Sequence, residues 1–140
     1  ARMFPINISG LRRVFKSLER NELLVFLPDQ VPDYGARGFI GTFFGHDAYT
    51  SDLVHRVISK YDSEIVFGSV MRDFSEGRVK YRICFEKPAD EIYSKDVEVH
   101  ISSLNSSLER LVMKAPEQYQ WSYKRFKRLN KLEKNIYRRQ

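Results

Sequence analysis

The chain has 140 residues, of which 42% are hydrophobic and 14% aromatic, so it has enough apolar material for one packed domain and does not resemble a disordered chain. Its apolar runs fall well short of the roughly 20 residues that a membrane-spanning helix needs, and the opening ARMFPINISG lacks the long apolar core of a secretory signal. Cys84 is the single cysteine, which excludes an internal disulfide and a thiolate metal cluster and fits a reducing compartment.

The net charge of +6 is distributed unevenly. Eight of the 24 basic residues lie between Lys124 and Gln140, where Glu133 is the only acid, so the rest of the chain is close to neutral. A basic tail of this kind suits phosphates, whether of nucleic acid, of anionic lipid or of a phosphorylated sugar.

The first third of the chain predicts a helix, a strand and a loop. Ser9 can cap a helix whose inner face carries Leu11, Val14, Phe15 and Leu18. The run ELLVFLPDQ predicts a short buried strand from Leu23 to Leu27 that Pro28 ends. Residues 29–38 have the composition of a loop, and FIGTFFG (39–45) predicts either a second strand or a hydrophobic turn.

The remainder predicts two helices around a hairpin. TSDLVHRVISKYD (50–62) is typical of a helix capped by Thr50 or Ser51. SEIVFGSVMR (63–72) and RVKYRICFEK (78–87) predict two strands joined as a hairpin. A clear amphipathic helix follows and ends before Pro116; its apolar residues are Val97, Ile101, Leu104, Leu108 and Leu111.

This order of elements predicts an α/β fold, with a mixed sheet flanked by helices. The leading helix runs into a strand that no other strand precedes, so the predicted sheet lacks its first members.

No complete active site is evident in the residues. His46, His55 and His100 are far apart and none has a histidine three to five positions away, so we expect no metal and no other cofactor. Neither a glycine-rich phosphate loop nor a serine-centred nucleophile elbow occurs in the sequence.

The loop LPDQVPDYGARGF is a better candidate for a binding or catalytic site. Asp29 follows a predicted buried strand, which is where α/β folds place ligand-binding and catalytic groups. Gly35 and Gly38 allow tight turns around Arg37, whose guanidinium can hold a phosphate through two hydrogen bonds. A turn in which Asp29 merely caps backbone amides explains the same pattern equally well.

Four strings identify a family. LPDQVPDYGARGFIGTFFG, AYTSDLVHR, EIYSKD and PEQYQWSYKRFKR, in this order between about Gly10 and Arg128, resemble the lipid A late acyltransferases. These are the lauroyl and myristoyl transferases of Gram-negative bacteria, within the lysophospholipid acyltransferase superfamily. The resemblance implies a partial glycerol-3-phosphate-acyltransferase-like fold, with residues 1–128 as the C-terminal portion of the acyltransferase domain and residues 129–140 as a basic tail.

The resemblance also implies an activity and a location. Members of the family transfer a fatty acyl chain from acyl carrier protein to a hydroxyl of a lipid A precursor that bears acidic Kdo sugars. They work at the cytoplasmic face of the inner membrane, to which an N-terminal apolar helix anchors them. Their catalytic signature is a histidine followed five positions later by Asp or Glu, in which the histidine acts as general base on the acceptor hydroxyl.

That signature is absent from these 140 residues. The residues five positions after the three histidines are Ser51, Lys60 and Asn105. In the family, the signature lies upstream of the region that matches here. With the missing first strands and a first residue that is not Met, this predicts the C-terminal half of an acyltransferase, without catalytic residues and inactive by itself.

The remaining expectations concern binding. For the substrate we expect Asp29, Gln30 and Arg37 in the loop, and Arg72 at a strand end, where a solvated surface role is equally probable on physical grounds. For the membrane or the acidic carrier protein we expect Trp121, Lys124, Arg125, Lys127 and Arg128. The alternative is a non-catalytic basic module that binds anionic membrane or nucleic acid; since nucleic acid would account for the tail alone, we expect no such partner. Exposed strand edges predict self-association of the chain through Leu23–Leu27 or a neighbouring strand.

Overall fold

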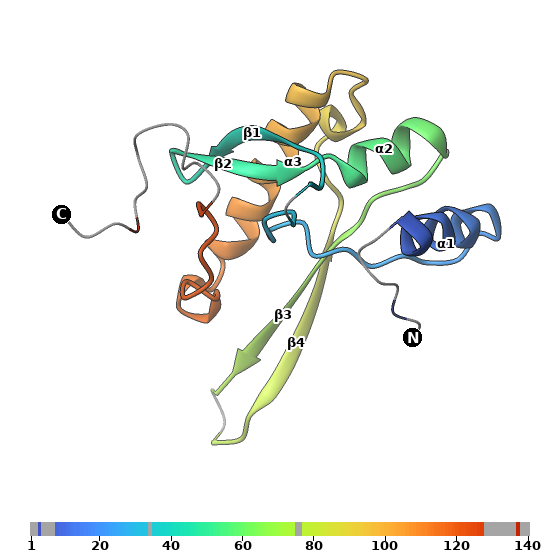
Figure 1. Cartoon of the computed structure of the whole chain (residues 1–140). Helices are drawn as coiled ribbons and strands as arrows, with labels where there is room; N and C mark the ends of the chain where they lie inside the picture. The colour runs from blue at the N-terminus through green and yellow to red at the C-terminus, as the bar shows by residue number, and fades with distance from the viewer. Residues whose placement is uncertain (1–2, 4–7, 34, 75–76, 128–136, 138–140) are drawn as a thin grey trace.

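The structure is a computed structural model that describes residues 3, 8–33, 35–74, 77–127 and 137 (Figure 1). Its elements are α1 (Ile8–Glu19), β1 (Gly38–Phe43), β2 (His46–Ser51), α2 (Leu53–Lys60), β3 (Phe67–Asp73), β4 (Lys80–Glu86), the 3₁₀ helix η1 (Asp90–Tyr93), α3 (Val97–Val112) and the 3₁₀ helix η2 (Pro116–Gln118). The predicted α/β class is confirmed, since the described residues form three α-helices and two antiparallel pairs of strands, β1–β2 and β3–β4.

The core forms where α3 covers the β1–β2 hairpin (Figure 1). Helix α3 begins after Asp96, whose carboxylate accepts a hydrogen bond from the Glu98 amide at 2.8 Å, as an N-cap does. Gly41 lets β1 approach the helix, because a Cβ there would lie 2.5 Å from Cγ2 of Ile101. The buried cluster at this contact consists of Phe43, Ala48, Phe67, Ile92, Leu104 and Leu108.

The β1–β2 hairpin turns through two residues with left-handed backbone. Phe43 pairs with His46, so Phe44 (φ 48°) and Gly45 (φ 74°) form the turn. Glycine adopts this conformation freely, whereas for phenylalanine it is strained. The Phe44 amide donates to the Glu109 carboxylate on α3 at 2.7 Å, which holds the turn. Strand β1 was one of the two alternatives predicted for residues 39–45, whereas the sequence analysis predicted no strand at β2.

The prediction of a buried strand at Leu23–Leu27 is wrong. The segment is extended but is not paired with another strand among the described residues, and Leu23 is 91% and Val25 81% exposed. A strand requires a hydrogen-bonded neighbour as well as an apolar sequence, and the described part of the chain does not supply one here.

The helix starts and one strand start also differ from expectation. Helix α1 begins at Ile8, so Ser9 lies within its first turn, and Asp52 rather than Thr50 or Ser51 takes the N-cap position of α2. Strand β3 begins only at Phe67 instead of residue 63. The hairpin of β3 and β4 is confirmed, with Val70 opposite Ile83, and extends away from the other elements (Figure 1).

Candidate functional site

Two of the strings that carry the family resemblance lie against each other. They are the Asp29 loop (residues 28–37) and the aromatic-basic segment (residues 115–127). The Val31 amide in the loop donates a 2.8 Å hydrogen bond to the Tyr123 hydroxyl in the segment, across 92 positions of sequence. Val31 is buried, so the loop is packed onto the molecule at this point.

Asp29, which is half-buried, lies near Tyr119 and Arg125 of the segment. Burial raises the pKa of Tyr119 to about 12, and the neighbouring Asp29 carboxylate adds to the rise, whereas Arg125 opposes it. Burial lowers the pKa of Arg125, while Tyr119 and Asp29 act in the opposite direction. Asp29 of the loop thus forms a charged and polar cluster with Tyr119 and Arg125 of the aromatic-basic segment.

Arg125 anchors the aromatic-basic segment to the core. Its side chain is only 2% exposed, and its guanidinium donates to the Tyr49 carbonyl and to the Thr50 hydroxyl, each at 2.7 Å. The guanidinium carbon also lies 5.4 Å from the centre of the Phe43 ring. The expectation that Arg125 meets lipid or carrier protein is therefore wrong, because its charged group is enclosed by protein.

The hydrogen bonds continue from Thr50 to α3. The Thr50 hydroxyl accepts from Arg125 and lies 3.2 Å from Oδ1 of Asn105, to which it can donate. The Asn105 amide group donates in turn to the Thr42 carbonyl at 3.0 Å. The sequence analysis did not predict this network. A signal for it was present, because Asn105 directly follows Leu104 on the buried face of α3, where a polar residue indicates a buried hydrogen-bond partner.

Arg37 has an internal partner. Its Nε lies 3.0 Å from Oδ2 of Asp52, and the Arg37 side chain is 70% exposed while that of Asp52 is 3% exposed. The guanidinium also lies 5.6 Å from the centre of the Phe39 ring. Gly35 has a left-handed backbone (φ 84°) that turns the loop before Arg37. The ion pair fixes one side of the guanidinium and leaves most of the side chain open to solvent.

Gln30 and Arg72, which were also predicted to bind substrate, lie on different parts of the structure. Gln30 is exposed in the Asp29 loop. Arg72 is exposed on β3, and its backbone N–H and C=O bond the side-chain amide of Gln118 at 2.7 and 2.9 Å. Gln118 thereby occupies the edge of β3 as a neighbouring strand would, and connects the aromatic-basic segment to the hairpin.

The aromatic residues of the segment pack around the β1–β2 turn. Trp121 packs edge-to-face against Tyr119 and at a tilt against Phe44, with ring centres 4.9 and 5.6 Å away, and its indole N–H donates to the Pro116 carbonyl at 2.7 Å. Its side chain is nevertheless 55% exposed. Trp121 is therefore held rigidly while it presents an apolar surface to the outside.

Lys124 and Lys127 follow this tryptophan closely in the sequence, and both are exposed. The Lys127 ammonium lies 5.1 Å from the centre of the Tyr123 ring, as in a cation–π contact. Arg128 and the predicted tail of residues 129–140 lie outside the described residues, apart from Tyr137.

The three histidines do not form a metal site. Groups of three or more His, Cys, Asp or Glu side chains that can hold a metal are absent from the described residues. His100 is completely buried, and its Nδ1 donates to the Ile92 carbonyl at 2.5 Å. Burial lowers its pKa, and the nearby His55, whose ring centre is 5.1 Å away, lowers it further. His100 is thus a neutral core residue.

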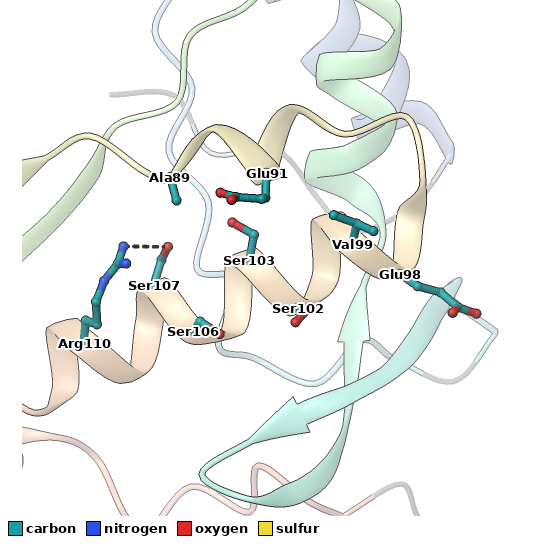
Figure 2. Close-up of a pocket in the computed structure, with 9 residues that line it drawn as sticks. All are labelled: Ala89, Glu91, Glu98, Val99, Ser102, Ser103, Ser106, Ser107 and Arg110. Atoms are coloured by element: carbon teal, nitrogen blue, oxygen red, sulfur yellow. Dashed lines mark hydrogen bonds between the residues drawn. The ribbon is translucent and has the colours of Figure 1, made fainter.

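The structure also contains a pocket that the sequence did not indicate (Figure 2). It has a volume of about 440 Å³ and lies on the side of α3 that faces η1. Its lining comprises Ala89, Glu91, Glu98, Val99, Ser102, Ser103, Ser106, Ser107 and Arg110. None of the predicted substrate-binding residues lines it, so the pocket is separate from the cluster around Asp29.

Comparisons with known proteins agree with the resemblance. Residues 1–128 match the family model described as bacterial lipid A biosynthesis acyltransferase. The chain is 31% identical over 126 residues to the lipid A biosynthesis palmitoleoyltransferase of Escherichia coli (strain K12), which covers 87% of this chain and 39% of that protein. The identity and coverage are the same for a lipid A biosynthesis acyltransferase of Shigella flexneri.

A third relative, the lipid A biosynthesis lauroyltransferase of Escherichia coli (strain K12), is 28% identical over 119 residues, or 84% of this chain and 38% of that protein. The chain therefore spans about two fifths of the length of these curated relatives. Because the family model matches almost the whole sequence, the chain belongs to the bacterial lipid A biosynthesis acyltransferase family.

Proposed function

We propose that this protein supplies the acceptor-binding and membrane-facing part of an acyltransferase. The reaction is transfer of a fatty acyl chain from acyl carrier protein to a hydroxyl of a Kdo-bearing lipid A precursor. The observation that carries the proposal is the family match over residues 1–128, which includes both the Asp29 loop and the aromatic-basic segment.

The acceptor is proposed to meet Arg37. Its side chain is 70% exposed and its guanidinium is positioned by the Asp52 carboxylate, so the remaining N–H groups can bind a phosphate or a Kdo carboxylate of the acceptor. Gln30, on the same loop, contributes a polar contact, and Arg72 adds a second cation. Asp29 acts as a positioning residue, because it lies near Tyr119 and Arg125 beneath the loop.

The aromatic-basic segment is proposed to face the membrane or the carrier protein, at the cytoplasmic face of the inner membrane. Trp121, Lys124 and Lys127 combine an exposed indole with two exposed cations, a combination typical of a membrane–water interface. Arg128 belongs to the same proposal. Among the described helices, none has the length and apolar character that crossing a membrane requires.

Acyl transfer requires a general base that these 140 residues lack at family spacing, because the positions five residues after the histidines are Ser51, Lys60 and Asn105. His100 cannot substitute, since it is buried and donates to a backbone carbonyl. We therefore propose that further polypeptide carrying a His-x4-Asp/Glu motif completes the enzyme.

The first experiment is an assay of the purified 140-residue chain with acyl carrier protein carrying a fatty acyl chain and with a Kdo-bearing lipid A precursor. We expect no transfer above the blank. Transfer by the chain alone contradicts the proposed division of labour, although not the family assignment.

The second experiment places substitutions in a longer protein that contains this chain and the motif. Arg37→Ala should raise KM for the acceptor by roughly tenfold or more, because hydrogen bonds between charged groups contribute about 1.5–3 kcal/mol. Arg37→Lys should restore part of the affinity. Arg20→Ala is the matched control, since Arg20 is also exposed and ion-paired, with Glu22. An Arg37→Ala enzyme with unchanged KM and kcat shows that the loop has only a structural role.

A further inference from the structure

Two tyrosine hydroxyls attach the Asp29 loop to the rest of the structure. Near the start of the loop, the backbone amide of the buried Val31 donates to the Tyr123 hydroxyl at 2.8 Å. Near its end, the Tyr49 hydroxyl donates to the Ala36 carbonyl at 3.3 Å. Both hydrogen bonds join a tyrosine side chain to the backbone of the loop. The course of the loop backbone is thus restrained at two points by residues outside the loop.

The buried Arg125 connects the two tyrosines. Its guanidinium donates to the Tyr49 carbonyl at 2.7 Å, and its backbone amide donates to the Tyr123 carbonyl at 2.8 Å. Tyr49 lies on β2, which pairs with β1, whereas Tyr123 lies in the aromatic-basic segment. Both hydroxyls therefore extend from parts of the chain that one enclosed residue holds together.

The second of these hydrogen bonds acts next to Arg37, because Arg37 directly follows Ala36. The Arg37 side chain is fixed by Asp52, whose Oδ2 lies 3.0 Å from its Nε. Residues 23–27, which precede the loop, pair with no strand among the described residues, so backbone pairing there does not restrain the loop. A long arginine side chain loses rotamer freedom when it binds a ligand, and a mobile backbone adds to that cost. The hydrogen bond from Tyr49 reduces this additional cost.

From these contacts we propose that Tyr123 and Tyr49 are positioning residues for acceptor binding, which hold the loop so that Arg37 is preorganised for the anionic group of the acceptor. This inference rests on the proposed function, because it depends on the contact between Arg37 and the acceptor. The tyrosines act through the loop backbone and do not touch the acceptor. Without a hydroxyl, the loop gains conformations in which Arg37 is displaced, and the apparent affinity falls with the fraction of competent loops.

The kinetics of Tyr123→Phe, in the longer protein that carries the His-x4-Asp/Glu motif, test the proposal. We expect KM for the acceptor to rise roughly threefold to tenfold with little change in kcat, because one hydrogen bond to the loop is lost. Tyr93→Phe is the matched control, since the Tyr93 hydroxyl also accepts from a backbone amide, that of Ile65 at 3.0 Å, outside the loop. Tyr49→Phe should raise KM as well.

Combination with Arg37→Ala shows whether Tyr123 acts through Arg37. In the Arg37→Ala background, Tyr123→Phe should change KM little further, because the residue that it positions is gone. Additive effects of the two substitutions, or equal effects of Tyr123→Phe and Tyr93→Phe on KM, overturn this inference and leave the proposed function intact. An Arg37→Ala enzyme with unchanged KM overturns the acceptor contact of the proposed function, and this inference with it.

Amide hydrogen exchange of the 140-residue chain provides a readout that needs no activity. The Val31 amide should exchange roughly threefold faster or more in Tyr123→Phe, and at the original rate in Tyr93→Phe. Unchanged protection of the α3 amides establishes that both variants keep the fold. If the Val31 amide exchanges at one rate in all three chains, the Tyr123 hydroxyl does not restrain the loop, and the inference is wrong whatever the enzyme assay shows.

Discussion

Within one short basic run, Lys-Arg-Phe-Lys, the structure separates residues of the same charge into different roles. Lys124 and Lys127 are exposed, whereas Arg125 is buried among Tyr49, Thr50 and Phe43. A planar guanidinium can reach two acceptors in different directions at once, which an ammonium group does less well. A charge count along the sequence cannot distinguish these roles, because it does not include the acceptors that tertiary structure provides.

We expect Arg125→Met to lower the free energy of unfolding by about 2 kcal/mol or more, because it leaves the Tyr49 carbonyl and the Thr50 hydroxyl without their donor in a buried site. Lys127→Met is the matched control and should cost less than about 1 kcal/mol, since only an exposed cation–π contact is lost. Urea unfolding followed by circular dichroism measures both. Equal effects of the two substitutions contradict the anchoring role of Arg125.

At the scale of elements, helices were easier to predict than strands. The apolar stripe of α3 specifies a buried face by itself, and the structure buries Ile101, Leu104 and Leu108 as expected. A strand depends on its partner, which the local sequence does not contain. Leu23–Leu27 therefore appeared to be a strand, but it pairs with no strand among the residues that the structure describes. His46–Ser51 did not appear to be a strand and pairs as β2.

Gly41 links the helix to the sheet, and its replacement tests that contact. We expect Gly41→Ala to reduce the free energy of unfolding by about 1–3 kcal/mol, because the new methyl group would overlap Ile101 and crowd Asn105. Gly68→Ala on β3 is the control: its Cβ would lie 3.4 Å from the Phe85 ring, which is close to ordinary contact, so its effect should be near zero. Thermal unfolding compares the two, and a silent Gly41→Ala would show that α3 and β1 can separate without cost.

At the scale of the whole molecule, the sequence predicted the family and singled out the Asp29 loop and the aromatic-basic segment. It did not predict that these two segments contact each other. The Asp29 loop and the aromatic-basic segment are joined by the Val31–Tyr123 hydrogen bond and by Asp29 near Arg125. Neither string contains information about the other's position. The buried Thr50 and Asn105 beneath them were likewise not predicted, since an isolated polar residue acquires its role only from the neighbours that folding supplies.

The arrangement makes a specific prediction about membranes. We expect the chain to bind vesicles that contain phosphatidylglycerol, with an affinity that falls as salt rises, because each basic residue near an anionic surface contributes about 1 kcal/mol. The double variant Lys124→Glu/Lys127→Glu should bind much more weakly, whereas Arg12→Glu/Arg13→Glu, an equal charge change at exposed positions of α1, should have a smaller effect. Sedimentation with vesicles at two salt concentrations measures this.

Trp121 provides a second readout in the same experiment, because it is the only tryptophan, is half-exposed and is close to these lysines in the sequence. Its fluorescence should shift to shorter wavelength on anionic vesicles, as an indole does when it leaves water, and should not shift on DNA at the same salt concentration. Three outcomes contradict a membrane role for this segment. They are binding that does not depend on salt concentration, an equal loss of vesicle binding in both double variants, and an affinity for DNA that matches the affinity for anionic vesicles. The residues beyond 127 are identical in all of these variants, so any difference between the variants must come from the substituted positions.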